Sequence, residues 1–202
     1  MTITYAIPDL HGRIDLLESA IDRVVAHSGG APAMVVTLGD YVDRGPDNRQ
    51  VIERLMGWTS DKLKLVALKG NHEAMMLEAC NNLAELGWWI GNGGDRTLAS
   101  YGSDNCDPRN VPSEHLNWIA NLPLMHVDQH RVFVHAAVDP TISLHQQSEQ
   151  TNSKAPIIVP RRRAGVSGDC RTARSASWSV RGTISAGHFG DALCEPPTAG
   201  SV

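Results

Sequence analysis

Four short polar clusters in this sequence carry the residue types that bind metals and phosphate. They are DLHG, GDYVDRG, GNHE and VHA, which occur in this order between residues 9 and 136. A site for two divalent cations needs oxygen and imidazole ligands, and a carboxylate can bridge the two ions. The clusters supply such a set, in which we expect Asp40 to be the bridge: Asp9, His11, Asp40, Asn71 and His135.

The same clusters contain three residues suited to other roles. Arg44 cannot ligate a cation, but its planar guanidinium can hold two phosphate oxygens at once. His72 follows the candidate ligand Asn71, so we expect it to protonate a leaving group. Asp43 is expected to orient the His72 imidazole and to raise its pKa. Together with a metal site, these residues predict a phosphoester hydrolase.

Each cluster taken alone also has an ordinary structural explanation. The first cluster could be a turn before a helix, and Asp43 and Arg44 could form a surface ion pair. Asn71 could cap a helix, and His135 could be a hydrogen-bonded core histidine. The four clusters have complementary chemistry and each lies at the end of a predicted strand, which favours one shared site.

The clusters follow apolar runs that have the length and composition of strands. These runs are residues 3–7, 34–38, 63–68 and 131–134, each rich in Val, Ile or Leu. Helical spacing of apolar residues lies between or after them, at residues 14–25, 51–56, 74–86 and 114–122. Alternating strands and helices predict an α/β fold. Its ligands would gather at the carboxyl ends of adjacent strands.

Composition indicates one soluble domain. The chain has 202 residues, of which 42% are hydrophobic and 20% charged, and no apolar run reaches the roughly 18 residues of a membrane span. The start MTITYAIPDLHG has no signal-peptide pattern, and the four cysteines form no CxxC pair. We therefore expect a cytoplasmic protein without a membrane partner. Trp88 and Trp89 are expected to pack in the core or on helices, although either could rim the cleft.

The clusters DLHG, GDYVDRG, GNHE and VHA resemble the phosphoprotein phosphatase branch of the metallophosphoesterases. That branch contains the serine/threonine phosphatases, the phage lambda-type phosphatases and the symmetric diadenosine tetraphosphatases. NGGDRTLASYG, residues 92–102, and NLPLMH, residues 121–126, resemble the bacterial members. The resemblance covers residues 3 to about 151 and implies a β-sandwich core flanked by helices. It also implies two metal ions, often manganese or iron with zinc, and in-line hydrolysis by a hydroxide that bridges them.

Matched motif by motif, the resemblance implies roles that agree with those argued from the residues. Arg44 resembles the phosphate clamp, and the pair Asp43 and His72 resembles the acid catalyst. The ligands resemble two sets that share one carboxylate: Asp9, His11 and Asp40 for the first metal, and Asp40, Asn71 and His135 for the second. The expected activity is that of a serine/threonine-type protein phosphatase. The alternatives are a symmetric dinucleoside tetraphosphate hydrolase and a catalytically impaired remnant that binds phosphate or metal.

The composition changes after about residue 151. Residues 1–151 contain 11 Lys and Arg against 19 Asp and Glu, whereas residues 152–202 contain seven against three. The resembled family continues here with a Trp-x-Arg segment and later a Gly-His that completes the second metal. This chain instead has NSKAP, a possible short strand at residues 157–159, and ISAGHFGD, in which His188 is the candidate last ligand.

We therefore expect a catalytic domain over residues 1–151 and a divergent tail over residues 152–202, with a fold that is incomplete at its C-terminal end. The tail is either disordered or read in a shifted frame. Its arginines lack the interleaved aromatic residues of a nucleic-acid-binding segment, so no nucleic acid is expected as partner. The resemblance implies a phosphorylated protein or a nucleotide as substrate.

Overall fold

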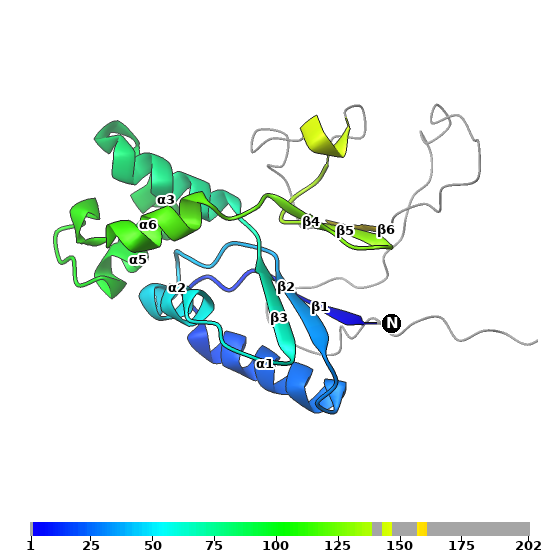
Figure 1. Cartoon of the computed structure of the whole chain (residues 1–202). Coiled ribbons are helices and arrows are strands. Elements are labelled where there is room, and N and C mark those ends of the chain that lie inside the picture. The colour runs from blue at the N-terminus through cyan, green and yellow to red at the C-terminus, as the bar shows by residue number, and fades with distance from the viewer. Residues whose placement is uncertain (1, 139–142, 147–156, 161–202) are drawn as a thin grey trace, which may run out of the picture. The chain divides into compact units, whose positions relative to one another are not determined.

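The first sheet of the protein consists of three parallel strands. The structure is a computed structural model that describes residues 2–138, 143–146 and 157–160 (Figure 1). The strands lie in the order β1 (Ile3–Ile7), β2 (Ala33–Thr37) and β3 (Leu63–Ala67). Their register pairs Ile7 with Thr37 and Thr37 with Ala67, so the three strands end level with one another. The polar clusters that follow them therefore start at the same edge of the sheet.

The central strand β2 is buried on both faces, which explains why it is a nearly continuous apolar run. Side chains alternate between the two faces along a strand. Val35 belongs to a large core that includes residues of the helices, whereas its neighbour Val36 belongs to a small core with Leu38, Leu68 and Phe133. The small core joins the first sheet to a second one.

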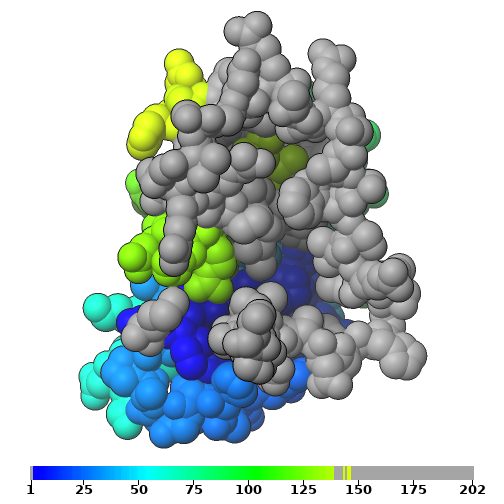
Figure 2. Space-filling model, turned by 90° about the vertical axis from the view of Figure 1, so that its right-hand side faces the viewer, coloured from blue at the N-terminus to red at the C-terminus, as the bar shows by residue number. Residues whose placement is uncertain are grey.

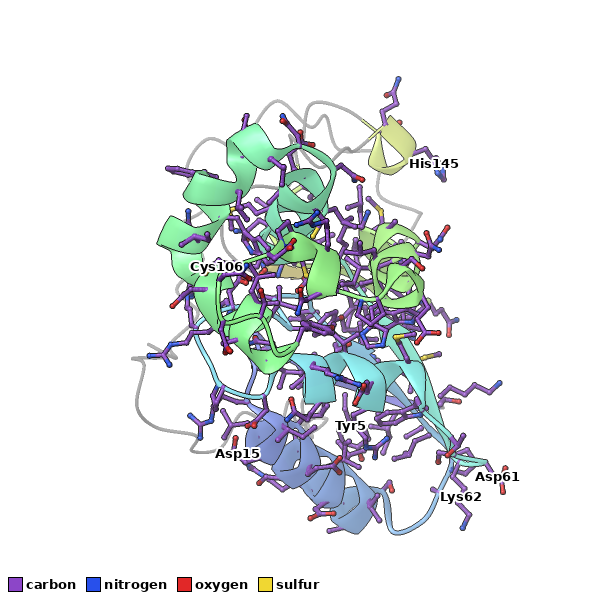
Figure 3. All side chains as sticks on the ribbon, turned by 90° about the vertical axis from the view of Figure 1, so that its left-hand side faces the viewer. Tyr5, Asp15, Asp61, Lys62, Cys106 and His145 are labelled. Carbon is purple, nitrogen blue, oxygen red and sulfur yellow. The ribbon has the colours of Figure 1, made fainter. Side chains whose placement is uncertain are left out.

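Helices α1 (Ile14–Ser28) and α2 (Asn48–Met56) follow the first two strands. Their buried residues recur at helical spacing and join the large core: Leu17, Ile21 and Val24 in α1, and Val51, Ile52 and Leu55 in α2. The chain leaves α1 at Gly29, whose φ of 57° gives the left-handed helix end that glycine accepts. In Figure 3, Tyr5 lies in the layer between β1 and α1, while Asp61 and Lys62 project from the loop before β3.

A chain of shorter helices follows the third strand and forms a separate group in Figure 1. Helix α3 (Asn71–Asn81) begins almost directly after β3 and is followed by the short helix η1 (Leu83–Glu85). Helix α4 (Leu86–Trp89) leads into a π-helical turn, η2 (Ile90–Gly94), and then into α5 (Asp95–Ser100). Helices η3 (Pro108–Asn110) and α6 (Ser113–Ala120) complete the group.

The second sheet is antiparallel and has the order β4 (Met125–Val127), β5 (Arg131–Val134) and β6 (Ile157–Pro160). A short helix, η4 (Leu144–Gln146), lies between β5 and β6 in the sequence. Phe133 of β5 is buried against β2 and β3 in the small core, so the two sheets pack face to face. Figure 2 shows residues of the second sheet, in yellow-green, on the same face of the molecule as β1 and α1, in blue.

The predicted mixed α/β fold with two sheets and flanking helices is confirmed. The strands predicted at residues 3–7 and 131–134 have those bounds, and the short strand predicted at residues 157–159 is β6. Strand β4 was not predicted. Most of the predicted tail, including His188, lies outside the described residues. Within the described part of the chain, no helix is long and apolar enough to cross a bilayer.

Candidate metal centre

The loops after β1, β2, β3 and β5 meet at one site. The amides of Leu10 and His11 donate to the Asp40 carbonyl at 3.0 and 2.8 Å, which ties the first loop to the second. The second and third loops approach so closely that a Cβ on Gly39 would lie 2.5 Å from the nitrogen of Gly70. His135, directly after β5, donates to the Leu38 carbonyl at 2.9 Å. The structure thus brings all four predicted clusters together.

Four residues of the site adopt the left-handed backbone conformation. They account for all but one of the non-glycine residues with positive φ in the described chain: His11 at 42°, Asp40 at 53°, Asp43 at 74° and Arg44 at 69°. This conformation costs a non-glycine residue on the order of 1 kcal/mol, and it persists where the surroundings fix it. The site is therefore held by its neighbours against a local backbone preference.

Glu73 supplies much of this support, and sequence reasoning did not single it out. Its carboxylate is fully buried and accepts hydrogen bonds from the amides of Asp40, Tyr41, Val42 and Gly70 at 2.8, 2.7, 3.3 and 2.8 Å. Burial, followed by the negative charge of Asp40, raises the pKa of Glu73 to about 7. The sequence carried one signal for this role. Glu73 stands three residues after Gly70 at the start of a helix, and an acid at that position can accept from the N-cap amide in a capping box.

Three imidazoles are oriented in the same way. Each Nδ1 lies against an oxygen: His11 against the Val42 carbonyl at 2.8 Å, His135 against the Leu38 carbonyl at 2.9 Å, and His72 against the Asp43 carboxylate at 2.6 Å. Carbonyl and carboxylate oxygens only accept, so Nδ1 carries a proton in each ring. In a neutral ring, Nε2 then keeps its lone pair. This is the arrangement that orients metal-binding histidines in proteins.

The Asp40 carboxylate lies at the centre of these rings. Its Oδ2 is 3.7 Å from Nε2 of His11 and 3.9 Å from Nε2 of His72, and its Oδ1 is 3.4 Å from Nε2 of His135. Nearby, Oδ1 of Asp9 is buried and has no hydrogen-bond partner among the described residues. Carboxylate oxygens and imidazole lone pairs that face one another form a donor set for divalent cations. The residues present therefore fit the two cations that the clusters imply.

The potential ligand atoms fall into two groups that share Asp40. One group contains His11, Asp40 and His72, and the other contains Asp9, Asp40 and His135, with the atoms of each group within 4.8 Å of one another. Asn71 lies beside the second group, where its Oδ1 is 2.9 Å from Nε2 of His135. The shared carboxylate has the position required of a bridge. Asp9 lies with His135 here, whereas the predicted sets placed it with His11.

The predicted acid pair is buried. The side chains of His72 and Asp43 are 3% and 0% exposed, and their 2.6 Å contact rules out the surface ion pair considered for Asp43 and Arg44. Burial acts to lower the pKa of His72, but the hydrogen bond to Asp43 and the charge of Asp40 outweigh it, and the pKa is raised. In contrast, burial lowers the pKa of His11.

Arg44 spans two of the imidazoles. Its Nη1 donates to Nε2 of His11 at 2.8 Å and its Nη2 to Nε2 of His72 at 2.9 Å. Both donors of the guanidinium fork therefore point into the centre, which is the orientation needed to hold two phosphate oxygens. Asn71 is also not the helix cap that its sequence position allowed. Gly70 is the N-cap of α3, and among the described residues the Asn71 side chain makes no capping bond.

Two further residues, Trp89 of α4 and Thr97 of α5, reach Asp43. Trp89 donates its indole N–H to both carboxylate oxygens at 3.0 Å, and the Thr97 hydroxyl donates to Oδ1 at 2.7 Å. Trp89 is fully buried, as expected for a packing residue, but it also makes this polar contact. Nothing in the local spacing of the sequence indicated contacts with a residue 46 or 54 positions away.

Two curated proteins and one solved structure are similar to this chain. The symmetrical bis(5'-nucleosyl)-tetraphosphatase of Pseudomonas fluorescens (strain SBW25) is 30% identical over 143 residues, which cover 70% of this chain and 45% of that protein. Serine/threonine-protein phosphatase 2 of Escherichia coli (strain K12) is 32% identical over 92 residues, which cover 45% of this chain and 38% of that protein. A crystal structure of a putative diadenosine tetraphosphatase has a TM-score of 0.49 at 19% identity, over 76% of this chain and 63% of that one.

This chain spans less than half the length of these two curated relatives. Residues 4–164, which include every predicted ligand and catalytic residue up to His135, match the family described as calcineurin-like phosphoesterases. That match covers well over half of the 202 residues. The chain belongs to the calcineurin-like phosphoesterase family, the metallophosphoesterases.

Proposed function

We propose that the protein hydrolyses phosphate monoesters with two bound divalent cations, as a serine/threonine-type protein phosphatase. The observation that carries the proposal is the convergence of the Asp40 carboxylate, three imidazole Nε2 atoms and the Arg44 guanidinium on one point. Such cations, when bound, neutralise phosphate charge and activate water as a nucleophile. Manganese is the cation expected, with iron and zinc as the alternative pair, and the cytoplasm is the expected location.

The protein's own residues have distinct roles in this proposal. Arg44 binds two oxygens of the phosphate with the donors that now point at His11 and His72. His72, whose pKa is raised, donates a proton from Nε2 to the leaving oxygen, while Asp43 holds Nδ1. The cations are held by the remaining members of the site: Asp9, His11, Asp40, Asn71 and His135.

A second candidate function is the symmetric hydrolysis of dinucleoside tetraphosphates. It is favoured by the relative that matches the larger share of this chain, 70%, and whose name states this activity. The same arrangement would serve, because Arg44 and His72 act on the phosphate and the leaving oxygen in either reaction. The two candidates differ in the leaving group, which is an alcohol side chain in one case and a nucleoside diphosphate in the other.

A paired assay separates the candidates. The full chain with manganese would be given a phosphoserine peptide and, separately, diadenosine tetraphosphate, and free phosphate and ADP would be measured. We expect phosphate release from the peptide, a large loss in His72→Ala, and none in the control His130→Ala, whose side chain is exposed outside the site. ADP formation alone would establish the second candidate. Stoichiometric metal binding without turnover of either substrate would contradict both.

A further inference from the structure

Asp43 is held by more donors than its pairing with His72 requires. Its carboxylate accepts from Trp89 Nε1 at both oxygens, 3.0 Å each, and from the Thr97 hydroxyl at 2.7 Å. The Thr97 hydroxyl oxygen in turn accepts from the Asp43 amide at 2.9 Å. All three residues are fully buried. A buried carboxylate is costly unless it is hydrogen-bonded, so this arrangement satisfies both oxygens with protein donors alone.

The two neighbouring tryptophans differ sharply. Trp88 is 66% exposed, whereas Trp89 is fully buried with its indole N–H on Asp43. Phenylalanine at position 89 would fill most of the same volume but could not donate. The chain thus offers a matched pair of positions for the same substitution, one at the carboxylate and one at the surface.

The segment from α4 to α5, which carries Trp89 and Thr97, is packed against the site. A Cβ on Gly94 would lie 2.6 Å from two atoms of the Trp89 indole, so only glycine lets the ring lie there. Gly93, with φ of 106°, accepts a hydrogen bond from the Arg44 amide at 3.2 Å, and a Cβ on it would lie 2.9 Å from Arg44 Cγ. The π-helical turn η2 therefore contacts Arg44 through Gly93 and packs Gly94 against the ring of Trp89, the residue just before the turn that binds Asp43.

We infer that Trp89 and Thr97 are positioning residues for the acid, which act on His72 through Asp43. The inference rests on the proposed hydrolase function. A carboxylate bound only by His72 can rotate about its Cβ–Cγ bond, and the ring would move with it. Two donors, the Trp89 indole N–H and the Thr97 hydroxyl, make three contacts that fix this rotation. Nε2 of His72 then points at the leaving oxygen when water adds to phosphorus and the P–O bond breaks. That oxygen keeps the bonding electron pair and takes the Nε2 proton.

This role predicts a dependence on the leaving group. An alkoxide needs a proton as it leaves, whereas p-nitrophenolate is a stable anion and leaves without one. Loss of a residue that hydrogen-bonds to a metal-ligating side chain typically lowers metal affinity or activity by 10- to 100-fold, and we expect a similar cost here. We expect Trp89→Phe to lower kcat/KM for a phosphoserine peptide by about 10- to 100-fold, and for p-nitrophenyl phosphate by less than about threefold.

The kinetic test uses the full chain loaded with manganese. Trp88→Phe is the matched control and should leave the ratio of the two kcat/KM values unchanged. Thr97→Val should shift the ratio in the same direction as Trp89→Phe, and Thr97→Ser, which keeps the hydroxyl, should restore it. Equal losses on both substrates in Trp89→Phe and Thr97→Val would overturn the inference, because they would indicate a merely structural role.

A second measurement does not depend on turnover. In protein with nitrogen-15-labelled histidine, the His72 Nδ1 proton should give an exchange-protected, downfield NMR signal, assigned by its loss in His72→Ala. We expect the signal to weaken in Trp89→Phe and Thr97→Val and to persist in Trp88→Phe. Its persistence in all three variants would overturn the inference. A wild-type chain with this signal but without turnover would instead count against the proposed function, so the two failures are distinguishable.

Discussion

The two sides of the site satisfy their carboxylates in opposite ways. On the acid side, formed by Asp43, His72, Trp89 and Thr97, every carboxylate oxygen accepts a hydrogen bond from a protein group. On the metal side, formed by Asp9, His11, Asp40, Asn71 and His135, the Asp9 side chain is 37% exposed, and its buried Oδ1 has no hydrogen-bond partner within the described part of the chain. The acid side is thus complete within the protein, whereas the metal side leaves a buried carboxylate oxygen available to a cation.

The acid side and the metal side therefore meet two different requirements. The acid side needs a rigid hydrogen-bonded carboxylate, since a proton must be delivered along a fixed direction. The metal side needs negative charge that remains available, because cations bind to carboxylates that are not already neutralised by donors. Asp40 belongs to both sides, since its oxygens face His72 as well as His135. The predictions below test how separate the two sides are.

The largest effect is expected from Asp40→Asn, which alters the group that both sides share. Loss of metal-based charge stabilisation is worth several kcal/mol, so kcat/KM should fall by about a thousandfold or more. Metal content, measured by plasma emission spectrometry, should fall as well. Asp61→Asn, an exposed change in the loop before β3, is the control. Full metal content in Asp40→Asn would show that the metal side does not depend on this carboxylate.

The next largest effect is expected from His72→Asn. General acids contribute about 100- to 10,000-fold, and kcat/KM for a phosphoserine peptide should fall within that range. Because the acid side is complete without cations, metal content should stay at the wild-type level. A His72→Asn protein that also lost metal would place His72 among the ligands, in the group that it forms with His11 and Asp40.

Metal removal should lower stability through the metal side. A cation present at a hundred times its dissociation constant stabilises a fold by about 2.7 kcal/mol, which corresponds to roughly 5–10 °C in Tm for a domain of this size. Chelation should therefore lower Tm by that amount, and manganese should restore it. In Asp9→Asn we expect a smaller gain on adding manganese. An equal gain would remove Asp9 from the ligand set.

The smallest effect is expected from Glu73→Gln, at the boundary of the two sides. The amide group cannot accept all of the four backbone N–H bonds that the carboxylate accepts. The N–H groups left without an acceptor should lower the unfolding free energy by about 1–3 kcal/mol. Because the raised pKa of Glu73, about 7, means that its ionisation disfavours folding, this loss should be smaller at pH 8 than at pH 6. Urea unfolding measures this, with the exposed Glu78→Gln in the same helix as control. A change no larger than the control's would show that Glu73 is dispensable for the loop.

The sequence predicted the strands well where a short apolar run is followed by a polar cluster. Residues 3–7 and 131–134 are such runs and have the predicted bounds. Strand β4 was missed because it has only three residues, Met125–Val127, and lies close after Pro123. Its strand character comes from its pairing with β5 across the sheet, which local composition does not reveal.

The candidate site was predictable to the same degree and for a related reason. Most of its residues follow strands of the parallel sheet, which brings them together once its register is known. His135 follows β5 and joins them because the second sheet packs on the first. Trp89, Thr97 and Glu73 were not predictable in this way. A buried tryptophan and a helical threonine look like packing residues, and their contacts with Asp43 arise only when α4 and α5 pack beside the second loop.

The left-handed backbone at His11, Asp40, Asp43 and Arg44 has an evolutionary consequence. Glycine and asparagine tolerate that conformation at least as well as the native side chains do. The backbone conformation alone therefore gives little resistance to such replacements, although each one removes a chemical group of the site. A descendant of this chain that drifted into a folded but inactive protein would be expected to show its first changes there.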